Sequence, residues 1–73
     1  MDILKAFGLR VKDLRVTRGL SQEKFAELAD LHRTYISQLE RGIKNPTLTS
    51  MEKIANATSI TLSELLKFKE EEY

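Results

Sequence analysis

The stretch LSQEKFAELADLHRTYISQLERG, residues 20–42, predicts two short helices joined by a tight turn. The first helix is expected over residues 22–29, because Ser21 is a preferred N-cap whose hydroxyl accepts a free N–H group of the first turn. Glu23 stabilises the same end of that helix through its negative charge. Asp30, a residue that tolerates turn conformations, then ends the helix.

Apolar residues recur at helical spacing on each side of this turn. The first stripe consists of Phe25, Leu28 and Ala29, and the second consists of Leu31, Ile36, Leu39 and Ile43. The second stripe leaves the polar residues of its helix on other faces. These polar residues are Arg33, Thr34, Ser37, Gln38 and Arg41. The sequence therefore predicts a second helix that packs with one side and presents hydrogen-bonding groups on the other.

A helix, a short turn and a second helix with a polar outer face describe a helix-turn-helix, whose second helix fits the major groove of DNA. Arg33 can fork onto guanine, Gln38 can pair with adenine, and Thr34 offers a methyl and a hydroxyl group. Ser37 can bond a base or a phosphate, and Tyr35 either touches DNA or covers the neighbouring helix. The alternative for each of these residues is a side chain without a DNA contact.

The loop that follows the second helix is basic and polar. Arg41, Lys44 and Asn45 would run beside the sugar-phosphate backbone of a bound duplex, where such contacts fix the position of a protein without reading sequence. The alternative is an ordinary solvated turn.

The remaining segments are expected to form the scaffold. A first helix is expected over residues 2–18. Its apolar face consists of Leu4, Phe7, Val11 and Leu14. Thr47 is a plausible cap for a fourth helix, and Thr61 with Glu64 forms the capping box of a fifth. Five helices without a strand pattern predict a compact all-α fold.

Length and charge agree with a small DNA-binding domain. The 73 residues predict a single domain, residues 1–73, with the helix-turn-helix at about residues 21–41. Residues 1–45 carry nine Lys or Arg against six Asp or Glu, a net charge of +3, whereas residues 46–73 carry three against five, a net charge of −2. The basic part therefore contains the helix-turn-helix.

Other classes of function lack a pattern that would support them. No nucleophile–base pair and no phosphate-binding glycine loop is present, which argues against an enzyme. The chain has no cysteine, and its one histidine, His32, has no partners at metal-ligand spacing. We therefore expect no metal, no cofactor and no small-molecule ligand. The absence of a signal peptide and of a long apolar span predicts a cytoplasmic protein without a membrane partner.

The motifs resemble the signature of the phage repressor and Cro (XRE) family of helix-turn-helix regulators. The residues that carry the resemblance are Ser21-Gln22-Glu23, Ala26, Ile36-Ser37, Leu39-Glu40-Arg41-Gly42 and Asn45-Pro46, with Phe7-Gly8, Arg15, Ile54-Ala55 and Leu65-Leu66 on either side. Residues 32–37 resemble the recognition helix of the controller proteins of restriction-modification systems. The chain departs from the family at Asp30 and at Ser59, where glycine is usual, and at His32, where a Ser or Thr cap is common. The resemblance implies a five-helix, lambda-repressor-like fold.

The resemblance also implies roles for single residues. Gln22 would contact the DNA backbone from the start of its helix, where the positive end of the dipole attracts phosphate. Arg15 and Glu40 would form a structural ion pair between the first and third helices. A homodimer is favoured, because regulators of this kind read two half-sites through two-fold symmetry. Leu62 and Leu66 are the candidates for its interface, and the alternative is that the last helix packs wholly inward.

Two functions from different classes follow. The sequence favours a sequence-specific, DNA-binding transcriptional regulator that acts as a homodimer on a pseudo-palindromic operator, in a restriction-modification setting on its own operon. The alternative is an antitoxin-like or coactivator-like protein-interaction module that keeps the fold and binds DNA weakly. The first is favoured because such a module would not need Arg33, Thr34 and Gln38 together on one outer face.

Overall fold

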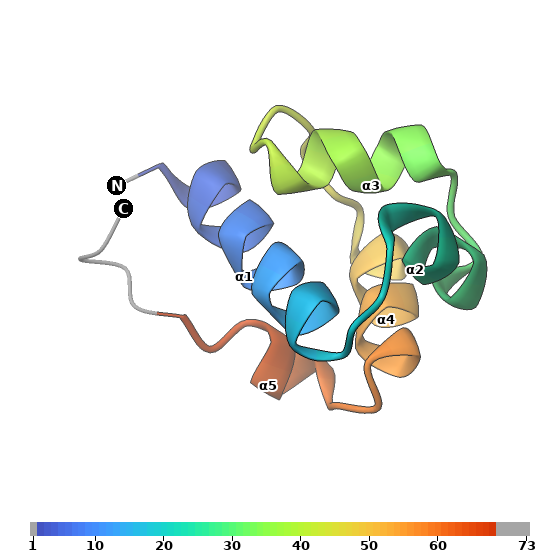
Figure 1. Cartoon of the computed structure of the whole chain (residues 1–73). Helices are drawn as coiled ribbons and strands as arrows, with labels where there is room; N and C mark the ends of the chain where they lie inside the picture. Colours follow the sequence, from blue (N-terminus) through green and yellow to red (C-terminus); the bar gives the residue numbers. More distant parts are fainter. Residues whose placement is uncertain (1, 69–73) are drawn as a thin grey trace.

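The computed structural model describes residues 2–68, which fold into five helices without a strand in that range (Figure 1). The helices are α1 (Ile3–Thr17), α2 (Gln22–Ala29), α3 (Arg33–Glu40), α4 (Leu48–Ala57) and α5 (Leu62–Leu65). The predicted all-α class and the five-helix order are confirmed. The bounds predicted for the first two helices agree with the structure to within one residue.

Polar side chains at the helix starts explain where the helices begin. The hydroxyl of Ser21 accepts the N–H of the third residue of α2 at 3.0 Å, and that of Thr47 accepts the corresponding N–H of α4 at 3.1 Å. Thr61 and Glu64 form a reciprocal capping box at the start of α5. The backbone N–H and the hydroxyl of Thr61 both donate to the Glu64 carboxylate. These two hydrogen bonds, the one from the backbone most of all, lower the pKa of Glu64. Caps of this kind each stabilise a helix by about 1 kcal/mol.

The turns after α2 and α4 each contain a non-glycine residue in the left-handed region. Asp30 follows α2 with φ 54°, and Ser59 follows α4 with φ 57°. Asp30 forms a salt bridge with Lys53 of α4 at 3.5 Å, and the Lys53 ammonium also donates to the Asp30 carbonyl at 3.3 Å. A left-handed conformation costs about 1–2 kcal/mol for such residues. The Asp30 side chain is 93% exposed, so this salt bridge is a surface pair that adds only about 0–1 kcal/mol at the turn between α2 and α3.

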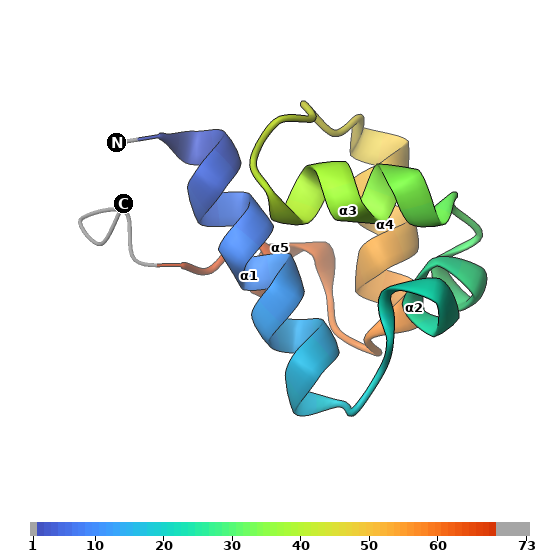
Figure 2. The ribbon, with the colours of Figure 1, turned by 45° about the horizontal axis from the view of Figure 1, so that its top comes forward.

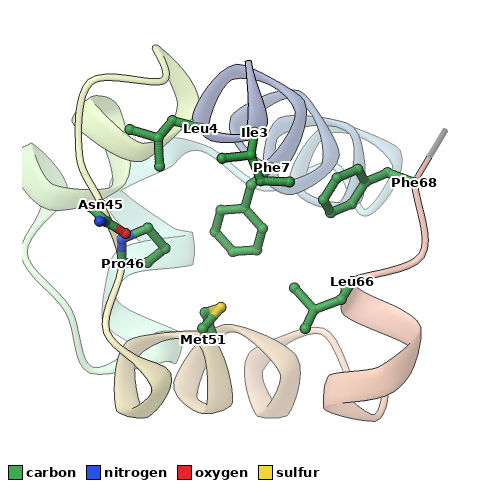
Figure 3. A pocket seen from close by; sticks show the side chains of 8 residues that line it. All are labelled: Ile3, Leu4, Phe7, Asn45, Pro46, Met51, Leu66 and Phe68. Carbon is green, nitrogen blue, oxygen red and sulfur yellow. The ribbon is translucent and has the colours of Figure 1, made fainter. Parts of the chain in front are cut away.

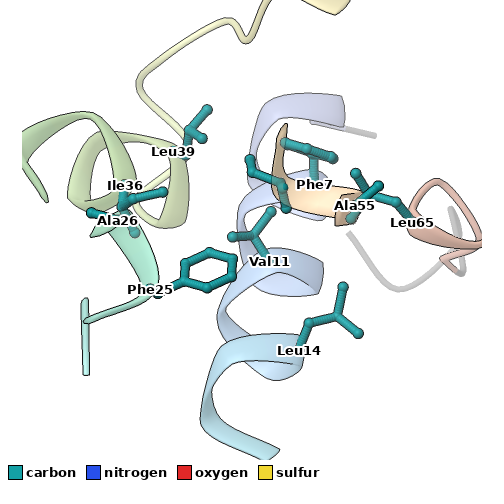
Figure 4. Close-up of a cluster of buried hydrophobic side chains, with 10 residues drawn as sticks. Phe7, Val11, Leu14, Phe25, Ala26, Ile36, Leu39, Ala55 and Leu65 are labelled. Carbon is teal, nitrogen blue, oxygen red and sulfur yellow. The ribbon is translucent and has the colours of Figure 1, made fainter. Parts of the chain in front are cut away.

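The core lies where the helices meet, and every helix contributes to it. The largest fully buried side chains are Val11, Phe25, Ile36, Leu39, Ile54 and Leu65. In Figure 4, Phe25 of α2 points toward Val11 of α1, with Ile36 and Leu39 of α3 on one side. Full burial of each of these side chains contributes about 1.5–3 kcal/mol. One side of α3 is thereby fixed against the rest of the protein.

The helices α1 and α3 approach each other at Gly8. A Cβ atom at Gly8 would overlap the carbonyl oxygen of Leu39 and would lie 2.9 Å from that of Glu40. Only glycine therefore fits, and the backbones of the two helices touch directly. This contact positions the C-terminal end of α3 on α1.

The expected apolar stripes are wrong at two residues. Leu28 is 50% exposed, because it lies roughly 110° around α2 from the centre of the buried side, at 100° per residue. Ile43 is 61% exposed, because α3 ends at Glu40 and the left-handed Gly42 turns the chain away, so helical spacing no longer applies. Both side chains instead add to the exposed apolar surface.

Candidate nucleic-acid interface

The outer side of α3 carries accessible polar side chains. Arg33 and Thr34 are exposed, and Ser37 and Gln38 are half-buried. The opposite side of the helix, at Ile36 and Leu39, is buried in the core. Figure 2 shows α3 in front, with α1 near its C-terminal end and α2 near its N-terminal end. The structure therefore brings four of the predicted base-contacting residues onto the accessible side of one helix.

Tyr35, the fifth predicted base-contacting residue, lies partly inside the protein. Its ring packs against the core, and its hydroxyl is buried without a hydrogen-bond partner among residues 2–68. The Lys44 ammonium lies 5.5 Å from the centre of the ring, within the range of a cation–π interaction. The ring of Tyr35 thus supports the loop after α3, and a DNA contact by its hydroxyl stays a prediction that requires the side chain to move.

An ion pair connects the two helices that meet at Gly8. The Arg15 guanidinium of α1 donates to both oxygens of the Glu40 carboxylate of α3, at 2.7 and 3.1 Å. A further N–H of Arg15 donates to the Leu20 carbonyl at 2.8 Å. The side chains of Arg15 and Glu40 are 13% and 4% exposed, so this bidentate pair lies almost wholly inside the protein. Such geometry supports the structural role expected for the pair.

Gln22 joins this ion pair from the start of α2. Its amide N–H donates to Glu40 at 3.1 Å, and the side chain is half-buried. One side-chain amide therefore links α2 to α3 while lying at the helix end where a phosphate contact was expected. Sequence reasoning missed this link, because no local pattern relates two residues that are 18 positions apart.

The loop after α3 presents its basic residues to solvent. Arg41, Lys44 and Asn45 are all exposed. Gly42 lies between them with φ 74°, a conformation that glycine adopts without strain. The three predicted phosphate-contacting residues of the loop are thus brought next to the C-terminal end of α3.

The two predicted interface residues have different surroundings. Leu62 is half-buried and packs against the core, whereas Leu66 is 43% exposed. Leu66 lines an apolar groove of about 170 Å³ between α1, α4 and the chain after α5 (Figure 3). The groove is lined by Ile3, Leu4, Phe7, Asn45, Pro46, Met51, Leu66 and Phe68. The structure therefore keeps Leu66 available for a partner and gives Leu62 a mainly inward role.

Two absences hold for the described part of the chain. No group of three or more His, Asp or Glu side chains within residues 2–68 could hold a metal ion. None of the helices in this range is long and apolar enough to cross a membrane.

Comparisons with known proteins agree with this geometry. The chain is 47% identical to the control protein C.MunI of Mycoplasma sp, over 97% of each chain. The crystal structure of the restriction-modification controller protein C.AhdI from Aeromonas hydrophila matches with a TM-score of 0.82 at 44% identity, over 85% of this chain and 94% of that one. SinR, a master regulator for biofilm formation, is also similar. Its structure in complex with DNA matches with a TM-score of 0.78 at 31% identity, over 84% of this chain and 98% of the SinR chain. The pattern of the helix-turn-helix family (HTH_3) matches residues 11–65, and the chain belongs to this family.

Proposed function

We propose that this protein is a sequence-specific, DNA-binding transcriptional regulator that inserts α3 into the major groove of its operator. The observation that carries the proposal is the two-sided character of α3. Its apolar side is fully buried at Ile36 and Leu39, while Arg33, Thr34 and Gln38 stay accessible on the other side. A helix held in this way presents a fixed set of donors and acceptors to base edges.

The proposed contacts divide into those that read sequence and those that fix position. Arg33 would donate to guanine and Gln38 would pair with adenine, each discriminating by about 1–3 kcal/mol against a wrong base. Arg41 and Lys44 would contact phosphates beside the groove and supply a salt-dependent, sequence-independent part of the affinity. Gln22 would add a contact to the DNA backbone from the start of α2. Binding alone, without a chemical step, is the proposed activity.

The regulator is proposed to act as a homodimer. An isologous contact through Leu66 and the neighbouring groove would give the dimer two-fold symmetry, so that it matches a pseudo-palindromic operator. The two α3 helices would then lie about 34 Å apart, one turn of the duplex. A protein of 73 residues also gains stability from burying this apolar surface.

The relatives suggest the setting. C.AhdI is named as a restriction-modification controller protein, and C.MunI as a control protein. We therefore propose that this protein controls a restriction-modification operon. Measurement of transcription from the promoter beside its own gene, with and without the protein, would test this part of the proposal.

Binding-site selection from random duplexes tests the assignment of α3. The wild-type protein should enrich a two-fold symmetric site, and Arg33→Ala should weaken binding to that site by about 1–3 kcal/mol and relax the preference at one base pair in each half-site. Arg41→Ala should weaken binding to all duplexes nearly equally, because a phosphate contact carries no base information. If Arg33→Ala and Gln38→Ala both keep the wild-type site and affinity, α3 does not read DNA and the protein-interaction alternative gains support.

A further inference from the structure

The first turns of α1 lie directly against the loop that follows α3. A Cβ atom at Gly42 would lie 2.7 Å from the Lys5 Cγ, 2.9 Å from its Cα and 3.1 Å from its backbone nitrogen. The aliphatic part of the Lys5 side chain therefore runs past Gly42. This contact is possible only because Gly42 has no side chain.

A second contact, one turn further along α1, keeps this arrangement in place. Gly8 touches the carbonyl oxygens at the C-terminal end of α3, so that Lys5 and Gly8 face the end of α3 and its loop together. Both views of the ribbon show the start of α1 beside this loop (Figures 1 and 2). The position of Lys5 relative to α3 is thus fixed by backbone contacts.

The charges around Gly42 make this region of the surface positive. Lys5, Arg41 and Lys44 are all exposed, and none of them has a carboxylate within 4 Å among residues 2–68. The carboxylate of Glu40 is neutralised inside the protein by Arg15. The carboxylate of Asp2 faces the start of α1, where it accepts the backbone N–H of Lys5 at 3.2 Å. Lys5, which contacts Gly42, is therefore joined by two cations of the loop that contains this glycine, Arg41 and Lys44.

We propose that Lys5 contacts a phosphate of the DNA backbone beside the base pairs that α3 reads. The inference rests on the proposed function, and it adds α1 as a further element of the DNA-binding surface. Lys5 acts as a point charge on phosphate, and Gly42 provides the space in which its side chain reaches the edge of the groove. Double-stranded DNA is the partner, and the contact is independent of sequence.

The salt dependence of duplex binding tests the proposal. The affinity of wild-type protein, Lys5→Gln and Lys5→Arg is measured between 50 and 200 mM salt, on the duplex selected by the wild-type protein and on a random duplex of equal length. Lys67→Gln is the matched control, because Lys67 is also an exposed lysine but lies beyond α5. Thermal unfolding followed by circular dichroism verifies that each variant is folded.

Lys5→Gln should make the slope of log affinity against log salt shallower by about 0.9 for each bound protomer. Over this fourfold range of salt, the variant should therefore lose about 3.5-fold less affinity per protomer than the wild type does. The effect should be equal on both duplexes, and Lys5→Arg should keep the wild-type slope. Lys67→Gln should run parallel to the wild type. An unchanged slope for Lys5→Gln, or an equal loss for Lys67→Gln, overturns the inference alone. A wild-type protein that binds neither duplex overturns the proposed function and this inference together.

Discussion

Replacement of Glu40 by alanine should destabilise the protein strongly. The carboxylate is 4% exposed and accepts hydrogen bonds from both Arg15 and Gln22. Its removal leaves the Arg15 guanidinium inside the protein with the Leu20 carbonyl as its remaining partner. Removal of one member of a buried ion pair costs about 3–5 kcal/mol, because the other charge stays buried without compensation.

This cost is large relative to the total stability. At about 0.05–0.15 kcal/mol per residue, a chain of 73 residues has a free energy of unfolding of about 4–11 kcal/mol. Glu40→Ala should therefore remove between about a quarter and all of it. Gln22→Ala leaves the ion pair intact and should cost less, about 1.5–3 kcal/mol, the range of a hydrogen bond to a charged group.

Urea unfolding followed by circular dichroism measures these differences. Glu27→Ala is the matched control, since the Glu27 side chain is 71% exposed and its pair with Lys24, at 3.5 Å, is a surface salt bridge worth about 0–1 kcal/mol. If Glu40→Ala destabilises the protein no more than Glu27→Ala does, the ion pair is not structural. An altered DNA preference in a Glu40→Ala protein of wild-type stability would instead place the pair at the DNA surface.

Three further predictions follow from single contacts. Gly42→Ala should lower the urea midpoint clearly more than Gly19→Ala does. Both residues have positive φ, but a Cβ at Gly42 would meet Lys5, whereas a Cβ at Gly19 would meet open space. Equal midpoints for the two variants would refute the close contact. The lowered pKa of Glu64 contributes stability that is present above the pKa of the unfolded state and is lost as pH falls through the pKa of the folded state. Glu64→Gln keeps a residue suited to the capping box, so it should be less stable than wild type at about pH 7 but not at about pH 2. A stability difference in urea unfolding that does not depend on pH would contradict this. Leu66→Glu should sediment as a folded monomer with reduced operator affinity, and the dimer proposal fails if the wild type is also monomeric on its operator.

The sequence predicted the helices well because their signals are local. The caps at Ser21, Thr47 and Thr61 depend on residues within three positions, and the structure forms each of them. The two failures have different causes. Leu28 lies within regular helix but about 110° from the buried side of α2, whereas Ile43 follows a left-handed turn, so neither reaches the core.

The surroundings of the site residues could be predicted only in part. Exposure of Arg33 and Thr34 follows from the position of the buried stripe, which the sequence displays. The link from Gln22 to the ion pair and the contact of Lys5 with Gly42 join elements that are distant in sequence. Such contacts depend on how the helices cross, and periodicity carries no information about crossing.

The backbone contact at Gly8 has a consequence for how such a protein acquires a new operator. Side chains between two helices can repack and let one helix tilt, but carbonyl oxygens that touch a glycine leave no such freedom. The orientation of α3 is therefore inherited with the scaffold. If α3 reads the operator as proposed, new specificity arises by exchange of its outward side chains, and the exposed Arg33 and Thr34 can change without disturbing the core. Divergence of operators within a lineage should accordingly concentrate at a few exposed positions, while the angle at which the helix enters the groove stays the same.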